Sequence, residues 1–202
     1  MLCLLGETYH AVKNDEKAIE CFNAVLKNDD TNSKACAGLA HIMCDRGDIK
    51  SAMQYVNKVI SRGLPDPEFF RLKTELLIMN EQYSTALTYL NTYESCVGHT
   101  YETVSMRVNI HLKQNKPDSA IRDINKAIKR SWDHDMTARL LYNKAEILFS
   151  TARDEEALAT LETAIRNAPI YFTDFLEIDP KFKNDMRIID LYNEINKNGN
   201  KN

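Results

Sequence analysis

The sequence contains few residues that interrupt helices. Only six of its 202 residues are glycine and five are proline, the two residue types that most strongly disfavour a helix interior. Hydrophobic residues make up 44% of the chain and charged residues 27%. This composition is typical of a soluble helical protein, and it argues against disorder over most of the chain.

The chain also lacks an excess of positive charge and any long apolar run. It has 26 Lys and Arg against 29 Asp and Glu, a net charge of -3, and the two signs are interspersed. A nucleic-acid-binding surface needs a basic stripe to meet the phosphates, so we expect no nucleic-acid partner. No apolar run approaches the length of a membrane span, so we expect no membrane insertion.

The cysteines are too irregularly spaced for a disulfide framework. They form an odd set with no paired spacing, namely Cys3, Cys21, Cys36, Cys44 and Cys96. Such a set is typical of free thiols in a reducing compartment. A cytoplasmic location is therefore expected.

The chain begins as though inside a helix. Leu2, Leu5 and Tyr9 share one helical face, and no Ser, Thr, Asp or Asn precedes them as a cap. The opening Met1 to Leu5 is too short for a signal peptide and has no basic flank. We therefore expect that sequence upstream of Met1 is missing, together with any targeting signal.

An internal period organises the sequence. Alanines recur every 34 residues and then after 37, at Ala18, Ala52, Ala86, Ala120 and Ala157. An apolar residue follows each alanine four positions later: Phe22, Val56, Leu90, Ile124 and Leu161. This spacing marks one face of a helix, and the alanine allows a neighbouring helix to approach closely. A period in the thirties indicates a stacked array, because one such unit cannot bury its apolar face alone.

The repeated pattern resembles the tetratricopeptide repeat, a 34-residue helix-turn-helix unit. The first repeat carries Leu5-Gly6, Tyr9, Ala18 and Phe22, and the second carries Leu39-Ala40, a turn at Gly47, and Ala52. The resemblance implies an all-α fold, a right-handed α-solenoid of antiparallel helix pairs. It gives five repeats at residues 1–31, 32–65, 66–99, 100–134 and 135–169, followed at 170–202 by a capping helix and a polar tail.

Three features depart from the regular pattern. Lys73-Thr74 stands where Leu-Gly is usual, and the loop 130–135 is three residues longer and contains the only tryptophan, Trp132. After Pro169 the repeat stops. A last helix is predicted at about 185–195, with an apolar face formed by Ile188, Leu191, Tyr192 and Ile195.

The resemblance also implies a binding groove, because the first helices of successive repeats line a concave surface in this family. The positions carried over to this sequence are Arg71, Leu72, Glu75, Met106, Asn109, Arg139, Tyr142, Asn143, Glu146 and Phe149. Asn109 and Asn143 match the asparagines that hold a peptide backbone in chaperone-binding members. Ser105, however, replaces the Lys of that subgroup, and both asparagines are equally well read as solvated groove residues.

Neither catalysis nor a cofactor is indicated. His41 and Cys44 lie three residues apart on one predicted helix, with His10 on another, but one such pair is weak evidence for zinc and ordinary packing explains it better. The sequence contains no nucleophile elbow and no Gly-rich phosphate loop. We therefore expect a protein that is not an enzyme and binds no metal.

The favoured function is a scaffold that holds an extended peptide or a helix of a partner protein in its groove. One alternative is self-assembly, with the exposed end of the first repeat forming a homo-oligomer. A third is a regulatory repeat segment of a larger protein or enzyme. The sequence does not distinguish the partner, the pathway or the oligomeric state.

Overall fold

The computed structural model describes residues 1–63 and 66–199, and all secondary structure in these ranges is helical. The predicted repeat boundary at Pro65 and the last residues of the predicted tail, 200–202, lie outside the described residues. The chain divides into an N-terminal unit, Met1–Gly98, and a C-terminal unit, His99–Asn202. Within the described ranges, no helix is both long and apolar enough to cross a bilayer.

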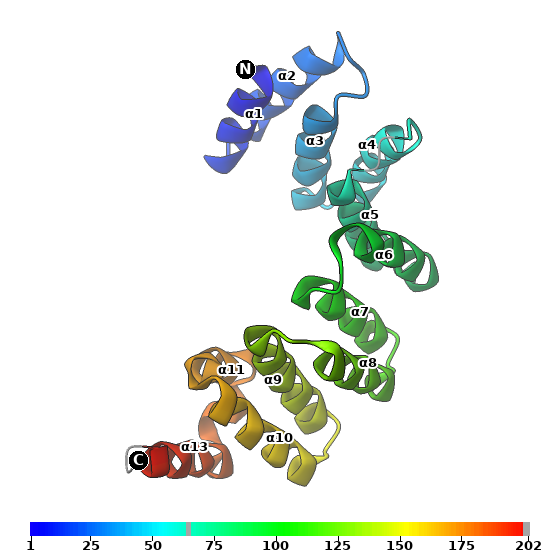
Figure 1. Ribbon diagram of the computed structural model, residues 1–202. Helices are drawn as coiled ribbons and strands as arrows, with labels where there is room; N and C mark the ends of the chain where they lie inside the picture. The colour runs from blue at the N-terminus through cyan, green and yellow to red at the C-terminus, as the bar shows by residue number, and fades with distance from the viewer. Residues whose placement is uncertain (64–65, 200–202) are drawn as a thin grey trace. The chain divides into compact units, whose positions relative to one another are not determined.

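In the described residues of the N-terminal unit, 1–63 and 66–98, six helices pack in consecutive pairs (Figure 1). They are α1 (Leu2–Ala11), α2 (Asp15–Leu26), α3 (Ser33–Asp45), α4 (Ile49–Ile60), α5 (Pro67–Met79) and α6 (Tyr83–Val97). Side chains of Asn14, Asn32, Asp48 and Asp66 accept backbone N–H bonds at the starts of α2 to α5. These caps satisfy amide groups that would otherwise have no partner within the helix.

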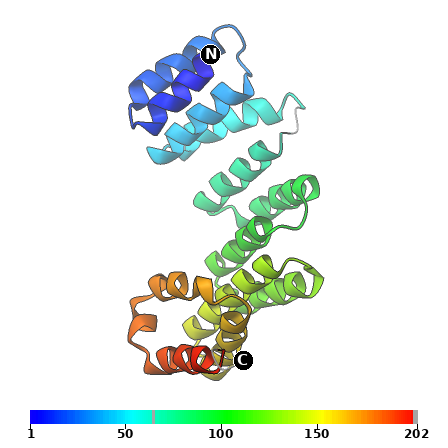
Figure 2. The same cartoon turned by 60° about the vertical axis from the view of Figure 1, so that its left-hand side comes forward.

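The C-terminal unit has four long helices followed by shorter ones. The long helices are α7 (Tyr101–Lys113), α8 (Pro117–Arg130), α9 (His134–Ser150) and α10 (Asp154–Asn167). They are followed by η1 (Pro169–Tyr171), α11 (Phe172–Ile178), α12 (Pro180–Asn184) and α13 (Met186–Gly199). Figure 2 shows this orange-to-red segment turning back alongside α9 and α10. The sequence predicts only the last of these shorter helices, at 185–195.

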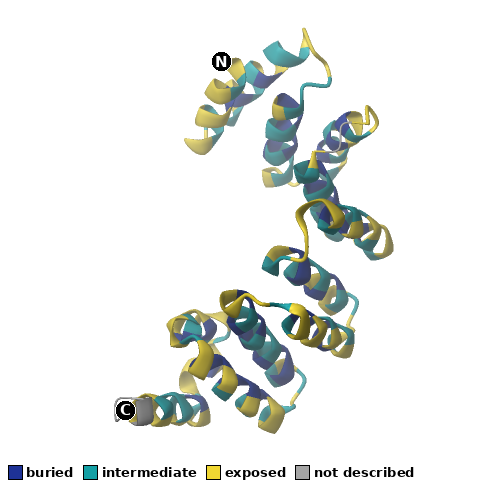
Figure 3. Cartoon of the chain, in the orientation of Figure 1, coloured by how far each residue is buried: buried dark blue, intermediate teal, exposed yellow. Residues whose placement is uncertain are grey.

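The five alanines that recur through the sequence, called the alanine ladder below, lie in the cores of the two units. All five alanines are fully buried, and so are the five apolar residues that follow them by four positions. Figure 3 shows the buried residues on the facing sides of the paired helices within each unit. The sequence period therefore identified the packed face of every second helix correctly.

The turns inside the helix pairs repeat with the same period as the alanines. One residue in each has a positive φ: Lys13 (60°), Gly47 (76°), Glu81 (57°), Asn115 (56°) and Ala152 (56°). The next backbone N–H then bonds to a carbonyl five residues back, as from Asp48 to Met43 at 2.8 Å and from Arg153 to Leu148 at 3.0 Å. This geometry reverses the chain while it satisfies carbonyl groups at the helix end.

Glycine is required for another reason where helices cross. A Cβ placed on Gly6 would lie 2.8 Å from the ring of Phe22, and one on Gly38 would lie closer still to the same ring. The two glycines therefore allow α1 and α3 to pack directly over Phe22, which is fully buried. Gly6 is the glycine of the Leu-Gly pair in the repeat pattern, whereas Gly38 lies two residues before the equivalent position, Ala40.

Candidate functional site

The first helices of the pairs line an open cavity in the N-terminal unit. Its volume is about 440 Å³, and its walls come from α1, α3, α5, the residue preceding α5, and Phe22 of α2. Phe22 and Phe69 border it as core residues that are 0% and 2% exposed, while Glu7, Asp45, Asp66 and Glu68 contribute carboxylates. Lys34, His10 and His41 are the basic groups in the wall. The carboxylates thus exceed the permanent positive charge, which favours a cationic ligand.

The histidines of this cavity are already engaged with carboxylates. His10 Nδ1 lies 3.0 Å from Asp15 Oδ1, and His10 Nε2 lies 3.8 Å from Asp45 Oδ2. His41 Nε2 lies 3.8 Å from Glu68 Oε1. His41, Cys44 and His10 do not form a metal site together, since the described residues contain no group of three or more potential ligands placed to hold a metal ion.

Arg71 and Glu75 lie together on α5, as their helical spacing requires. The Arg71 guanidinium bonds to Glu68 Oε2 through Nε at 2.9 Å and to Glu75 Oε1 through Nη1 at 2.5 Å. Burial raises the pKa of Glu75, and the charge of Arg71 opposes that shift. Leu72 instead lies in the core with 2% of its surface exposed, so it cannot act as an apolar anchor for a ligand.

In the C-terminal unit, Arg139 and Asn143 meet around one aromatic ring. The Arg139 guanidinium lies 3.8 Å from the ring centre of Tyr101 and 5.9 Å from that of Tyr171. Asn143 Nδ2 donates a hydrogen bond to the Tyr101 hydroxyl at 3.1 Å. Met106 is half-buried and Asn109 exposed on α7. The structure thus joins Arg139 and Asn143 through Tyr101, a residue that the groove positions do not include.

Tyr142 is a core residue and does not face an open groove. Only 4% of its surface is exposed, and its hydroxyl donates to the Ala168 carbonyl at 3.0 Å. Its ring contacts those of Tyr171 and Phe175 at centroid distances of 6.4 and 5.7 Å. Burial raises the pKa of the Tyr142 hydroxyl. We therefore remove Tyr142, like Leu72, from the proposed ligand contacts.

Glu146 and Phe149 line a separate cavity of about 370 Å³ near the end of the C-terminal unit. The other walls come from α10 and from the segment that follows the repeats, including Asp179, Lys181, Phe182 and Arg187. Burial, and then the charge of Asp179, raise the pKa of Glu146. The sequence pattern missed the second wall because the repeat ends before it. The only signal was the Asp179-Pro180-Lys181-Phe182 stretch before the last helix.

Two parts of the chain match family profiles described as tetratricopeptide repeat. The matches cover residues 1–32 and 105–169, one in each unit. No curated protein matches the sequence.

Several solved structures share the fold at low sequence identity. YrrB, described as a TPR protein with an unusual peptide-binding site, superposes with a TM-score of 0.62 at 19% identity, covering 84% of this chain and 86% of its own. MamA from Desulfovibrio magneticus gives 0.66 at 11% identity, with coverages of 82% and 92%. TTC0263, a thermophilic TPR protein from Thermus thermophilus, gives 0.59 at 18% identity, with 86% and 93%. These similarities confirm the predicted all-α solenoid of helix pairs.

Proposed function

Because the chain belongs to the tetratricopeptide-repeat family, which generally provides protein-interaction scaffolds, we propose that it holds an extended, positively charged segment of a partner protein without catalysing a reaction. The observation that carries this proposal is the cavity on α1, α3 and α5. Its wall carries an excess of carboxylates over permanent cations, which suits a chain bearing basic side chains.

The N-terminal unit offers Arg71 and Glu75 on α5 as further contacts. The C-terminal unit offers a separate set of contacts. Met106 and Asn109 on α7 are accessible, and Arg139 and Asn143 on α9 are held in place by Tyr101. An asparagine amide offers both a donor and an acceptor to a peptide backbone. Glu146 and Phe149 belong to the second cavity.

A peptide-array screen followed by titration of the full chain tests the proposal. Glu7→Gln combined with Asp45→Asn removes two carboxylates from the cavity wall, and we expect it to weaken the best basic peptide roughly three- to tenfold. Glu155→Gln with Glu162→Gln makes the same charge change on α10 and serves as the control. Equal loss in both variants, or no loss in either, would contradict a site in this cavity.

Asn143 provides a second test in the other unit. Asn143→Ala should cost about 1 kcal/mol of binding, because peptide groups that it pairs with would be left unsatisfied. Binding that stays at the wild-type level would remove α9 from the proposed contact surface.

Self-assembly is a second candidate, and the outer face of α1 favours it. Leu4 and Leu5 on this helix are 67% and 42% exposed, and Val12, directly after the helix, is 68% exposed. Exposed apolar side chains of this kind promote association.

A further inference from the structure

The cavity of the C-terminal unit has an aromatic wall as well as a charged one. Phe149 on α9 and Phe182 on α12 both line it, and their ring centres lie 5.3 Å apart. Phe182 in turn stacks on Phe175, with ring centres 4.6 Å apart. The wall is therefore rigid and apolar. The volume of about 370 Å³ lies near the lower end for ligand sites and suits a single side chain better than a large cofactor.

Carboxylates outnumber cations in the lining of this cavity. Four carboxylates line it with two cations, Lys181 and Arg187. The Arg187 guanidinium already donates hydrogen bonds to two of these carboxylates, to Asp185 at 2.6 Å and to Asp154 at 2.8 Å. These contacts tie α13 to α10 and leave Lys181, which is exposed on α12, as the other cation of the lining.

Among the residues that line this cavity, Glu146 is a half-buried carboxylate. Its carboxylate is half-buried and makes no ion pair or hydrogen bond to any other residue in the described ranges. Burial disfavours its charged form, and the neighbouring Asp179 adds to that cost. A cation entering the cavity would remove both penalties, whereas an anion would increase them.

We propose that this cavity is a pocket for an arginine side chain of a partner protein, with Glu146 binding the guanidinium and the half-buried ring of Phe149 packing against it. This inference rests on the proposed function, because it assumes a protein ligand. A guanidinium is planar, stacks on aromatic rings and offers several donors to a carboxylate, while an ammonium is more strongly hydrated and cannot stack. The pocket thus selects arginine over lysine.

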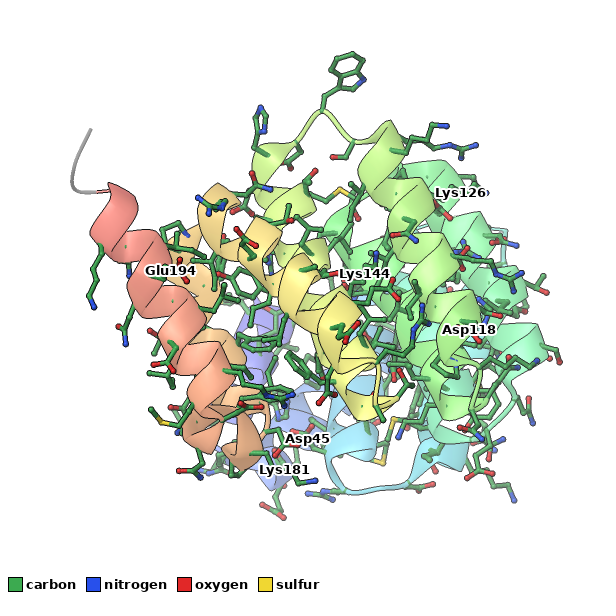
Figure 4. The ribbon with its side chains drawn as sticks, turned by 90° about the horizontal axis from the view of Figure 1, so that it is seen from below. Asp45, Asp118, Lys126, Lys144, Lys181 and Glu194 are labelled. Atoms are coloured by element: carbon green, nitrogen blue, oxygen red, sulfur yellow. The ribbon has the colours of Figure 1, made fainter. Side chains whose placement is uncertain are left out.

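The pocket is formed by other kinds of segments than the cavity on α1, α3 and α5. One wall is the end of α9, and the other is the segment after the repeats, so the pocket exists only where that segment folds back. Figure 4 labels Lys181 beside the start of α13 and Glu194 toward the other end of that helix. Glu194 is exposed and does not line the pocket, and it therefore provides a matched control.

The test is a titration of the ¹⁵N-labelled full chain with a blocked pentapeptide of four alanines around a central arginine. Backbone amide signals of Phe149 and Phe182 should shift and saturate. The same peptide with citrulline, which keeps the shape and loses the charge, should produce no saturating shift, and the lysine peptide should bind more weakly. Glu146→Gln should weaken the arginine peptide about tenfold, while Glu194→Gln should leave it unchanged.

Folding controls keep the result interpretable. Glu146→Gln removes an unpaired, half-buried charge, so the variant should melt no lower than wild type. Arginine binding that is unaltered by Glu146→Gln, or matched by citrulline, would overturn the pocket, and lysine binding of equal strength would overturn the choice of guanidinium. If the pocket fails while array peptides still respond to Glu7→Gln with Asp45→Asn, the scaffold function stands. If the arginine pentapeptide binds the pocket but no array peptide binds the chain, the proposed scaffold function is contradicted and the arginine pocket is not.

Discussion

At the scale of single residues, Lys73 is the main exception to the repeat pattern. It is 7% exposed on α5, and its ammonium group donates to Met53 Sδ at 2.8 Å and to Asn57 Oδ1. The ring of Tyr89 lies 5.6 Å away. No carboxylate among the described residues forms an ion pair with Lys73, and burial lowers its pKa from 10.5. The charge is thus held in the core without an ion-pair partner.

Replacing Lys73 should therefore stabilise the protein. We expect Lys73→Leu to raise the free energy of unfolding by about 1 kcal/mol or more at neutral pH, because it removes a desolvated charge from an apolar site. The lowered pKa means that the unfolded chain binds this proton more tightly. The wild type should therefore gain stability as pH rises toward 10.5, and the difference between the two proteins should shrink.

Urea unfolding at several pH values measures this effect. Lys126→Leu, at an exposed position on α8 labelled in Figure 4, is the control and should show no such pH trend. A difference between Lys73→Leu and wild type that stays constant up to pH 10.5 would show that the Lys73 pKa is not lowered.

Tyr142 gives a second prediction at this scale. Tyr142→Phe keeps the ring contacts and removes the hydroxyl that bonds to the Ala168 carbonyl. The loss should cost about 1 kcal/mol of unfolding free energy, because it removes the hydrogen bond of a largely buried hydroxyl. Thermal or urea unfolding measures the cost, and peptide titration should detect no change. A variant of wild-type stability that binds partner peptides more weakly would return Tyr142 to the contact surface.

At the scale of secondary-structure elements, the repeated turn depends on one unfavourable backbone angle. Gly47 adopts it at no steric cost, and a Cβ there would meet no other atom within 4 Å. Ala152 occupies the equivalent position at φ 56°, a conformation that costs an L-residue roughly 1–2 kcal/mol. Four of the five turns have a residue other than glycine at this position and are therefore strained there. The packing of the paired helices compensates for this cost.

Exchanging these residues tests that interpretation. Gly47→Ala should lower the free energy of unfolding by about 1 kcal/mol, and Ala152→Gly should raise it by roughly 0.5 kcal/mol after the greater flexibility of glycine in the unfolded chain is subtracted. Chemical unfolding of both variants gives the two values. Opposite signs are expected, and a loss of stability in both would mean that side-chain packing, not the positive φ, decides these positions.

At the scale of the whole molecule, the two units are built from the same helix pairs but end differently. The last pair, α9 and α10, is covered by the aromatic segment α11 to α13, where Phe172 and Tyr192 stack with ring centres 4.0 Å apart. In the described part of the chain, Leu4 on α1 and Val12 directly after it are exposed. The described structure thus covers the apolar face of the last helix pair and leaves these two apolar side chains of the first pair accessible.

Self-assembly through α1 makes a prediction for the intact chain. If this face joins two copies, Leu4→Lys should weaken association at least about tenfold, because it places a charge in an apolar contact. Sedimentation at several protein concentrations measures the change. Asn125→Lys adds the same charge on the exposed surface of α8 and should have no effect. A wild-type protein that stays monomeric throughout would exclude the self-assembly alternative over that concentration range.

Features that depend on short-range spacing could be predicted from the amino-acid sequence. The alanine period identified the buried face of the second helices, and the polar segments between them placed the turns. Every ladder alanine is buried because residues four apart on a helix share a face, and that face must be covered by a neighbour. Helix type and packed face could be predicted because both depend on residues close together in sequence.

What covers the other helix faces, such as those of α5 and α9, depends on tertiary contacts that the sequence pattern does not reveal. By spacing alone, Leu72 and Tyr142 are as suitable for a groove as Arg139 is, yet α9 is packed against a segment about thirty residues further along the chain, and this contact buries Tyr142. The same segment encloses Glu146 and Phe149 in a pocket. A helical period specifies the direction in which each side chain points, but whether it meets solvent, a ligand or the core depends on contacts between residues far apart in the sequence.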